Sequence, residues 1–398
     1  MSRSIRWPVC HDLEVGSHVV RYEPHTQKVR PARGRRPELY EIERLPELFR
    51  PECLTIAVTG RCSLDCSYCF GRSDEWAPRW PGEAAVRASA RWTAGCAHEQ
   101  GRPLVVGLHG SAEPLHDVAR VRKVVAWVAE EVASTGAEMR LGVTTSGVVD
   151  DEALDWAARV VDSVTVSVDG PPEVHDRHRR DRTGDATWAR VDRALQRLVT
   201  RRRPKHLALR MTMTSHGLPT MARDIEWLGE RYRPDVIVVN PVYLSTAHSV
   251  AANGFSSQLA AGRRRLRGTK VQVVFPGSRP GVRHGPFCPP LQGNLLLTPS
   301  GQAAWCFAEM GNGALSIGGY DAATDRFEID QARFRELLTA ASRPPVRCLE
   351  CACATHCSRG CPDSCALRSQ PSAGFCDLVQ ADLRERLVDA LDRPGDGP

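Results

Sequence analysis

The feature that most limits what this chain can fold into is an alternation of short apolar runs with longer amphipathic segments, beginning at residue 54. The amphipathic segments, such as 117–134 and 187–202, have helical character. Strands that alternate with helices predict βαβ units and a parallel sheet. Six apolar runs have strand character: LTIAVTG (54–60), LVVGLHG (104–110), MRLGVTTSG (139–147), SVTVSVDG (163–170), HLALRMTMT (206–214) and DVIVVNPVY (235–243).

Six such units predict an α/β fold built on a partial (β/α)6 TIM-like barrel. Chemistry in a barrel of this kind lies at the C-terminal ends of the strands, where several of the runs end in glycine or a polar residue. After about residue 270 the alternation is expected to stop. The remaining sequence is rich in Cys, Pro and Gly, and the turn PSG within 294–307 predicts a hairpin.

The domain organisation follows from these changes in pattern. The N-terminal part contains one extended-looking piece, HVVRYEP (18–24). The expected units are an N-terminal strap or accessory segment (1–50), the partial barrel (51–245), a linker (246–285), a cysteine-rich domain (286–380), and a C-terminal helix and tail (381–398).

The composition, with 42% hydrophobic and 25% charged residues, is typical of a globular protein. No run of about 18 apolar residues predicts a membrane span, and the first residues lack the apolar stretch of a secretory signal. We therefore expect a cytoplasmic protein with no membrane partner. In a reducing compartment, dense cysteines favour metal ligation over disulfides, and the odd count of fifteen agrees.

The net charge of +6 comes mainly from arginine. The basic runs RRRPKH (201–206) and RRRLRGTK (263–270) could bind nucleic acid or an acidic peptide, or could be a solvated loop and helix end. No aromatic residues interleave with them, which disfavours a nucleic-acid platform and favours the solvated surface.

The first cysteine group, RCSLDCSYCF (61–70), follows the first predicted strand directly. Cys62, Cys66 and Cys69 have the spacing C-x3-C-x2-C, and three thiolates on one loop suit an iron–sulfur cluster. A four-iron cluster would keep one iron open to another ligand. The alternative is a structural zinc site, completed by His109 or a distant cysteine.

The second cysteine group occupies residues 348–376, which hold seven of the fifteen cysteines. Its spacing begins C-x2-C-x5-C-x3-C, and Cys288 and Cys306 lie upstream. A zinc ribbon within 348–365 would leave these two upstream cysteines unexplained. Cys10, Cys53 and Cys96 fit neither group and are expected to be buried free thiols.

The order of strand, C-x3-C-x2-C, aromatic residue and helix resembles the radical S-adenosylmethionine (SAM) superfamily. HGSAEPL (109–115) resembles the Gly-Gly-Glu-Pro motif of that family, and TTSGV (144–148) ends the third strand where relatives often have Thr-Asn-Gly. SVDGP (167–171), HDRHR (175–179) and LRMTMT (209–214) resemble the subfamily that carries a C-terminal SPASM domain. The resemblance covers roughly residues 54–380.

The resemblance implies a [4Fe–4S] cluster at the first cysteine group, with SAM bound to its open iron. Each SAM contact has a structural alternative: Glu113 as a loop carboxylate, Ser167 as a strand-end hydroxyl and Arg179 as a surface cation. Ser111 and Ala112 replace two glycines, and Ser146 replaces the common asparagine, which leaves a contact from that loop open. The implied residues are Cys62, Cys66 and Cys69 for the cluster; Tyr68 and Phe70 near the adenine; Glu113 for the SAM ammonium, with Gly110, Ser111 and Ala112 admitting the backbone; and Ser167 and Arg179 for the ribose or carboxylate.

The SPASM resemblance implies two auxiliary iron–sulfur clusters. The cluster nearer the barrel lacks its usual fourth cysteine; either Cys353 or Cys365 replaces it, or the position stays open. By analogy, Cys348, Cys351, Cys357 and Cys376 hold the distal cluster, and Cys288, Cys306 and Cys361 hold the one nearer the barrel.

The implied activity is radical SAM chemistry of the oxidoreductase type. An electron from an external donor, such as flavodoxin or ferredoxin, leads to SAM cleavage and a 5′-deoxyadenosyl radical that abstracts a substrate hydrogen. We expect a peptide or protein maturase that forms bonds oxidatively. The alternatives are a small-molecule tailoring enzyme acting on a sugar or nucleoside, and a non-enzymatic iron–sulfur scaffold. Asn240 and Tyr243 are candidates to face the substrate, and the sequence names no catalytic acid or base.

Overall fold

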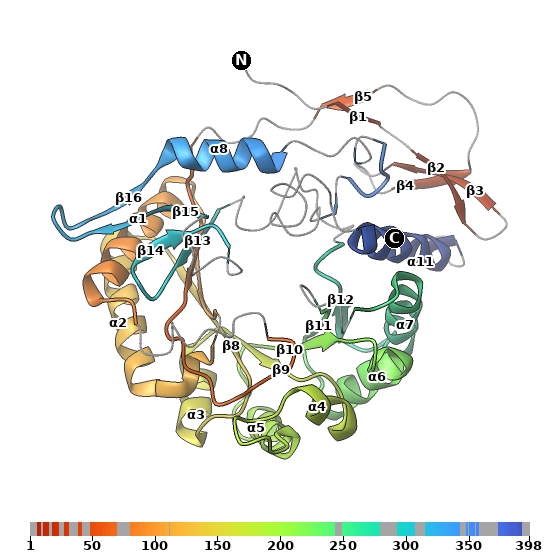
Figure 1. Ribbon diagram of the computed structural model, residues 1–398, viewed down its shortest axis with the longest axis horizontal. Coiled ribbons are helices and arrows are strands. Elements are labelled where there is room, and N and C mark those ends of the chain that lie inside the picture. Colours follow the sequence, from red (N-terminus) through yellow and green to blue (C-terminus); the bar gives the residue numbers. More distant parts are fainter. Residues whose placement is uncertain are drawn as a thin grey trace.

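A computed structural model provides the structure of the chain (Figure 1). The residues that it describes are 6–8, 11–15, 18–23, 28–31, 39–41, 48–69, 80–110, 112–242, 249–278, 293–306, 315–342, 348, 350–354, 356–357 and 373–391.

The N-terminal elements form two small antiparallel sheets. β1 (Arg6–Pro8) pairs with β5 (Leu39–Glu41), and β2 (His11–Val15), β3 (His18–Glu23) and β4 (Lys28–Pro31) form the other sheet. The extended piece predicted at 18–24 is therefore strand β3, the central strand of a three-stranded sheet.

A curved parallel sheet forms the body of the molecule, and all six predicted strands are present. The last of them, β11 (Val236–Pro241), also pairs in parallel with β12 (Gln272–Val274) through Val236, Ile237 and Val238. The alternation therefore continues past the point where it was expected to stop. The predicted strands are β6 (Cys53–Ile56), β7 (Leu104–Leu108), β8 (Met139–Thr145), β9 (Ser163–Ser167), β10 (His206–Met213) and β11.

Helices surround the outer, convex side of this sheet (Figure 1). The helices predicted over 117–134 and 187–202 are observed as α2 (Val118–Thr135) and α5 (Trp188–Thr200). The others along the barrel are α1 (Glu83–Glu99), α3 (Asp151–Val160), α4 (Pro172–His178), α6 (Met221–Tyr232) and α7 (Ala252–Arg265), with the short turns η2 (Pro114–Asp117) and η3 (Leu218–Thr220).

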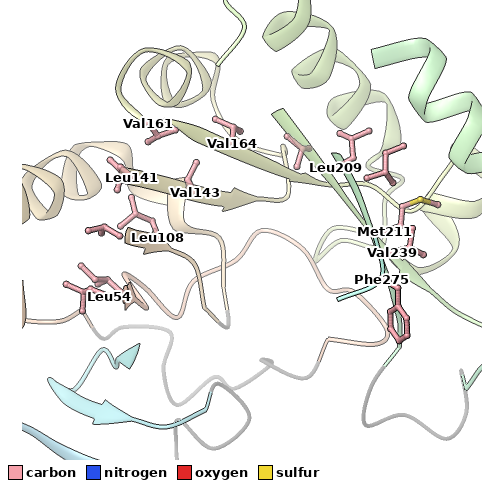
Figure 2. Close-up of a cluster of buried hydrophobic side chains, with 14 of the residues drawn as sticks. Leu54, Leu108, Leu141, Val143, Val161, Val164, Leu209, Met211, Val239 and Phe275 are labelled. Atoms are coloured by element: carbon pink, nitrogen blue, oxygen red, sulfur yellow. The ribbon is translucent and has the colours of Figure 1, made fainter. Parts of the chain in front are cut away.

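The core lies between the sheet and its helices, because every second strand residue points outward to the helices (Figure 2). In β9, Val164 and Val166 are fully buried, whereas Ser163, Thr165 and Ser167 are only half-buried. The inner face of the sheet therefore carries small and polar side chains, which leaves it suited to binding rather than to packing. This α/β partial barrel is the fold class that the sequence predicted.

The C-terminal third extends the same sheet. β13 (Asn294–Leu297) pairs in parallel with β6 and antiparallel with β14 (Gln302–Ala304), which confirms the predicted hairpin. β15 (Ser316–Asp321) and β16 (Arg326–Ile329) follow, and together these strands make an 11-stranded sheet. The helices beyond it are α8 (Gln331–Ser342) and α11 (Ala373–Leu391).

Ion pairs to neighbouring helices take up the charge of the basic run 263–270. Arg263 Nη1 lies 2.6 Å from Asp382 Oδ1, where the Asp382 side chain is completely buried. Arg264 pairs with Asp389 of α11 at 3.0 Å. These arginines hold α7 against α11, so this run is part of a helix interface as well as a helix end.

In the part of the chain that the structure describes, no helix is long and apolar enough to cross a bilayer.

Candidate active site

The loop that carries the first cysteine group lies at the carboxyl end of β6. We call residues 61–69 the cluster loop. The last two cysteines of this loop are joined by a turn, in which the Cys69 N–H donates to the Cys66 carbonyl at 3.0 Å. Cys62 and Cys66 are half-buried and Cys69 is exposed, so the loop presents one thiol to the surface.

In the cluster loop without metal, burial favours the protonated form of the thiols. Burial raises the pKa of Cys62 to about 12, and the Leu64 N–H opposes part of this shift. Burial likewise raises the pKa of Cys66 to about 11, with the charge of Arg179 opposing it. Among the described residues, no three His, Cys, Asp or Glu side chains converge closely enough to hold a metal ion. Three thiols on one loop nevertheless fit the donor set of a cluster, and their role as its ligands stays a prediction.

A second segment, residues 178–182, runs alongside the cluster loop, and we call it the return segment. Asp65 N–H donates to the Arg180 carbonyl at 2.8 Å, and Ser67 N–H donates to the His178 carbonyl at 2.9 Å. Arg182 Nε donates to the Cys62 carbonyl at 2.8 Å. Hydrogen bonds to its main chain therefore hold the cluster loop along its length.

Asp169 connects the cluster loop to the barrel wall. It follows β9 and is 2% exposed. Its Oδ2 accepts from Tyr68 Oη and from Arg179 Nε (3.0 Å), and its Oδ1 accepts from the Thr212 N–H of β10 at 2.9 Å. Burial alone would lower the pKa of Arg179, but Asp169, Tyr68 and Cys66 together outweigh it and raise the pKa well above its usual value. Sequence reasoning gave Asp169 no role, although its place at a strand end in SVDGP was a signal.

His178 adds a second connection between the cluster loop and the barrel. Its Nδ1 is hydrogen-bonded to Ser67 Oγ at 2.8 Å, and its Nε2 to Thr214 Oγ1, just beyond β10, at 3.1 Å. The ring also lies 5.6 Å from that of Tyr68. The sequence gave no reason to select His178 within HDRHR.

Glu113, the predicted acceptor of the SAM ammonium, is buried and fully hydrogen-bonded within the protein. Its Oε1 accepts from the Leu115 N–H (3.0 Å) and from Thr145 Oγ1 (2.8 Å). Its Oε2 accepts from the Ser146 N–H (2.6 Å) and from Ser146 Oγ (2.7 Å). Burial raises the pKa of Glu113, and these donors oppose that shift. The loop after β8 therefore contacts Glu113 through Ser146.

The remaining predicted SAM contacts surround the same strand ends. At Gly110, a Cβ would stand 3.0 Å from the Cβ of Ala57, so the close approach of two strand ends favours glycine there. Ser167 is the last residue of β9, half-buried on the inner face. Ala112 lies between Gly110 and Glu113, whereas Phe70 and Ser111 lie outside the described residues. The SAM-binding roles of all of these residues stay predictions.

Two further polar side chains, His109 and Asn240, lie at the carboxyl ends of β7 and β11. His109 follows β7, and burial, together with the charge of Arg210 of β10, lowers its pKa to about 4. His109 is therefore neutral at physiological pH. Asn240 of β11, a candidate to face the substrate, is buried, and Tyr243 lies outside the described residues.

The second cysteine group contacts three separate parts of the fold. Cys353 is buried and its Sγ donates to the Val379 carbonyl of α11 at 3.8 Å. Cys351 Sγ accepts from Gln380 Nε2 at the same distance. Cys357 forms a β-bridge with Ser278, beyond β12, and the His356 ring lies 6.1 Å from that of Tyr22 in β3.

These contacts bring the described part of residues 348–357 into one compact turn. Cys351 N–H donates to the Cys348 carbonyl at 3.2 Å, and Cys357 N–H to the Cys353 carbonyl at 2.8 Å. Cys353 faces α11, next to Cys351 and Cys357, which are expected at the distal cluster. Cys306 and Cys376 are half-buried. Cys288, Cys361 and Cys365 lie outside the described residues, so the ligand sets of both auxiliary clusters stay predictions.

Comparison with known proteins finds a family match over most of the barrel. Residues 56–226 match the family model of the Radical SAM superfamily, so this part of the chain is similar to a radical SAM domain. No curated protein sequence matches the chain.

Solved structures extend the likeness beyond that domain. Hexahistidine-tagged anSMEcpe with bound AdoMet superposes with a TM-score of 0.68 at 15% identity, over 86% of this chain and 97% of that chain. Native anSMEcpe with bound AdoMet and Kp18Cys peptide gives a TM-score of 0.65 at 14% identity, over the same shares. At these identities the likeness establishes a shared fold.

Proposed function

We propose that this protein is a radical SAM enzyme that modifies a peptide or protein by oxidative bond formation, with two auxiliary iron–sulfur clusters. The cluster that takes part in SAM cleavage would be held by Cys62, Cys66 and Cys69. An external one-electron donor of the flavodoxin or ferredoxin type would reduce it. The protein would work in the cytoplasm, where such clusters and free thiols are maintained.

The observation that carries this proposal is the extent of the shared fold. The match to anSMEcpe covers 86% of this chain, which is much more than the radical SAM domain alone. Native anSMEcpe is found with AdoMet and with two different peptides, Kp18Cys and Cp18Cys. A peptide substrate for the present chain is the simplest extension of that likeness, together with the cysteine spacing of its C-terminal third.

The residues of the chain have separable tasks in this proposal. When bound, the cluster and SAM supply a 5′-deoxyadenosyl radical, which removes a hydrogen atom from the substrate. The cluster loop presents the thiols at the carboxyl edge of the sheet. Glu113 would orient the SAM ammonium, and Ser167 would contact the ribose or carboxylate. The half-buried inner face of the sheet would hold the substrate. His109 would be neutral there, with one ring nitrogen able to donate a hydrogen bond and the other able to accept one.

The second cysteine group would handle the substrate after hydrogen abstraction. Its described turn packs against β3, α11 and the end of β12, so it is fixed to the same body as the barrel. Clusters bound by these cysteines would supply an electron acceptor for the substrate after hydrogen abstraction, or a site that binds the substrate.

Anaerobic reconstitution tests the enzyme class. The reconstituted protein should hold about twelve irons if all three clusters contain four, and it should convert SAM to 5′-deoxyadenosine when reduced with dithionite. Cys62→Ala should abolish this product. Cys96→Ala is the matched control, because Cys96 is a half-buried thiol of α1 outside both cysteine groups, and it should leave the product unchanged. A wild-type protein that forms no 5′-deoxyadenosine would refute the proposal.

Isotope transfer tests the substrate class. Deuterated peptides translated from short reading frames beside the gene should transfer deuterium into 5′-deoxyadenosine, with a matching mass change in the peptide. Transfer from a deuterated sugar or nucleoside, and from none of the peptides, would favour small-molecule tailoring instead.

A further inference from the structure

We infer that Asp169 and Arg179 are positioning residues that fasten the cluster loop to the barrel through Tyr68. The inference rests on the proposed use of the cluster loop to hold a cluster. It gives Arg179 a different task from the SAM contact that the sequence suggested.

The first observation is where the cluster loop is attached. Its main chain bonds to the return segment, as described above, but most of that segment is itself loop between α4 and α5. Asp169 instead lies two residues beyond the end of β9 and is bonded to the sheet, because it accepts from the Thr212 N–H of β10 at 2.9 Å. Tyr68 reaches this carboxylate from the cluster loop. The Tyr68 hydroxyl is therefore a direct side-chain link between the loop and the strand ends.

The second observation is the position of Tyr68 in the cluster loop. It lies between Ser67 and Cys69, and two residues after Cys66. A displacement of its ring would move the two thiols that close the C-x2-C turn. His178 contacts the same ring and also holds the preceding residue, since its Nδ1 bonds to Ser67 Oγ at 2.8 Å.

The third observation is the charge balance at Asp169. A buried carboxylate is stable only when an opposite charge and hydrogen bonds replace its hydration. Arg179 supplies both, with its Nε 3.0 Å from Asp169 Oδ2 and its guanidinium carbon 5.4 Å from the centre of the Tyr68 ring. Arg179 is 7% exposed. Arg179 therefore supplies the opposite charge beside the Asp169 carboxylate and Tyr68.

The chain provides a matched control for this arrangement. On the outer helices, Asp192 of α5 accepts from Tyr232 Oη (2.6 Å) and from Arg231 Nη2 (2.9 Å), both of α6. The same three side-chain types meet there, away from the cluster loop. Asp192→Asn should therefore lower the melting temperature without affecting the loop.

The experiment compares Tyr68→Phe, Asp169→Asn and Arg179→Lys with Asp192→Asn. Tyr68→Phe removes only the hydroxyl and keeps the ring, so any stacking on SAM is preserved. The first readout is hydrogen exchange of peptides spanning 61–69 in the metal-free protein. The second is the affinity of the reduced, reconstituted protein for SAM, together with the change that SAM makes in the electron paramagnetic resonance spectrum.

We expect Tyr68→Phe and Asp169→Asn to speed exchange in 61–69 and to weaken SAM binding by about tenfold each, the equivalent of one hydrogen bond to a charged group. Arg179→Lys should show smaller changes in both hydrogen exchange and SAM affinity. Asp192→Asn should change neither quantity. If Asp169→Asn does not fold, Tyr68→Phe decides the matter. Unchanged exchange in Tyr68→Phe would overturn the inference. So would a loss of SAM affinity confined to Arg179→Lys, because it would indicate direct contact with SAM. A wild-type protein that binds no cluster would refute the proposed function, while the exchange result would still decide the role of Asp169.

Discussion

Glu113 gives the sharpest prediction, because its carboxylate has no acceptor position left for a ligand. A carboxylate has about four lone-pair positions, and four protein donors fill them, two of them from Ser146. If the SAM ammonium binds Glu113, it must displace a donor. The Ser146 hydroxyl is the donor most easily displaced, because it can rotate about one bond, whereas the N–H groups are fixed by the backbone. We therefore consider Ser146→Ala.

The magnitude follows from the bond that is removed. Ser146 Oγ donates to Glu113 Oε2 at 2.7 Å, and a hydrogen bond to a charged group stabilises a protein by about 1.5–3 kcal/mol. Ser146→Ala should lower the free energy of unfolding of the SAM-free protein by about this amount. SAM binding should become stronger to a similar extent, because the displaced bond no longer has to be broken. At about 1.4 kcal/mol per factor of ten, the dissociation constant of SAM should fall roughly tenfold.

Equilibrium dialysis of labelled SAM against the anaerobic, reconstituted protein measures the affinity, and thermal unfolding of the same samples without SAM measures the stability. Thr145→Val is the comparison. Thr145 Oγ1 donates to Glu113 Oε1 at 2.8 Å, but Thr145 is 1% exposed whereas Ser146 is half-buried. Each hydroxyl also accepts from an N–H two residues further on, that of Gly147 for Thr145 and that of Val148 for Ser146. This variant should lose stability without any gain in SAM affinity. If Ser146→Ala weakens SAM binding, or leaves it unchanged while stability falls, the displacement argument is wrong.

Two further predictions concern stability. Burial lowers the pKa of His175 to about 4, so the unfolded chain binds the proton more readily between pH 6.5 and 4, and this contribution to stability is lost as the pH falls through that window. The free energy of unfolding should fall by about 2 kcal/mol from this cause between pH 7.5 and 5. The melting temperature of His175→Gln should therefore drop less over that interval than that of the wild type. Parallel plots of melting temperature against pH for the two proteins would contradict this role of His175. At Gly318, with φ +142°, a Cβ would stand 2.1 Å from the Glu328 carbonyl oxygen, so Gly318→Ala should separate β15 from β16 and destabilise the protein by at least about 2 kcal/mol. Gly184→Ala, where φ is +87° and the space is open, should lose only about 1 kcal/mol in a thermal melt, and equal losses would show that the contact with Glu328 is unimportant.

The sequence was sufficient for those elements whose signal is local. The six apolar runs and the PSG turn were found because strand periodicity and turn chemistry act over a few residues. β12 was missed because Gln272–Val274 is only three residues long, too short for a periodic signal. The parallel pairing of β13 with β6 was missed because nothing local encodes which distant strand borders another.

The candidate site shows the same division. The cysteines and Glu113 were identified from motifs, and the structure places Glu113 and the first cysteine group at the strand ends where the fold predicts chemistry. The four donors to Glu113 and the role of Asp169 were not foreseen. Ser146 is 33 residues from Glu113 in the chain, and Tyr68 is 101 residues from Asp169, so only the folded chain brings them together.

The pairing of β13 with β6 has a consequence for the synthesis of the chain. Thr55 Oγ1 donates to Asn294 Oδ1, across 239 residues. At about 5–20 residues per second, the ribosome needs roughly ten to fifty seconds to deliver β13 after β6 has been made. During that interval one edge of the strand that precedes the cluster loop has no neighbour, and unprotected edges invite pairing with other chains. The barrel can thus be completed only late in translation, and a chain that stops before β13 would have an aggregation-prone edge beside its thiols.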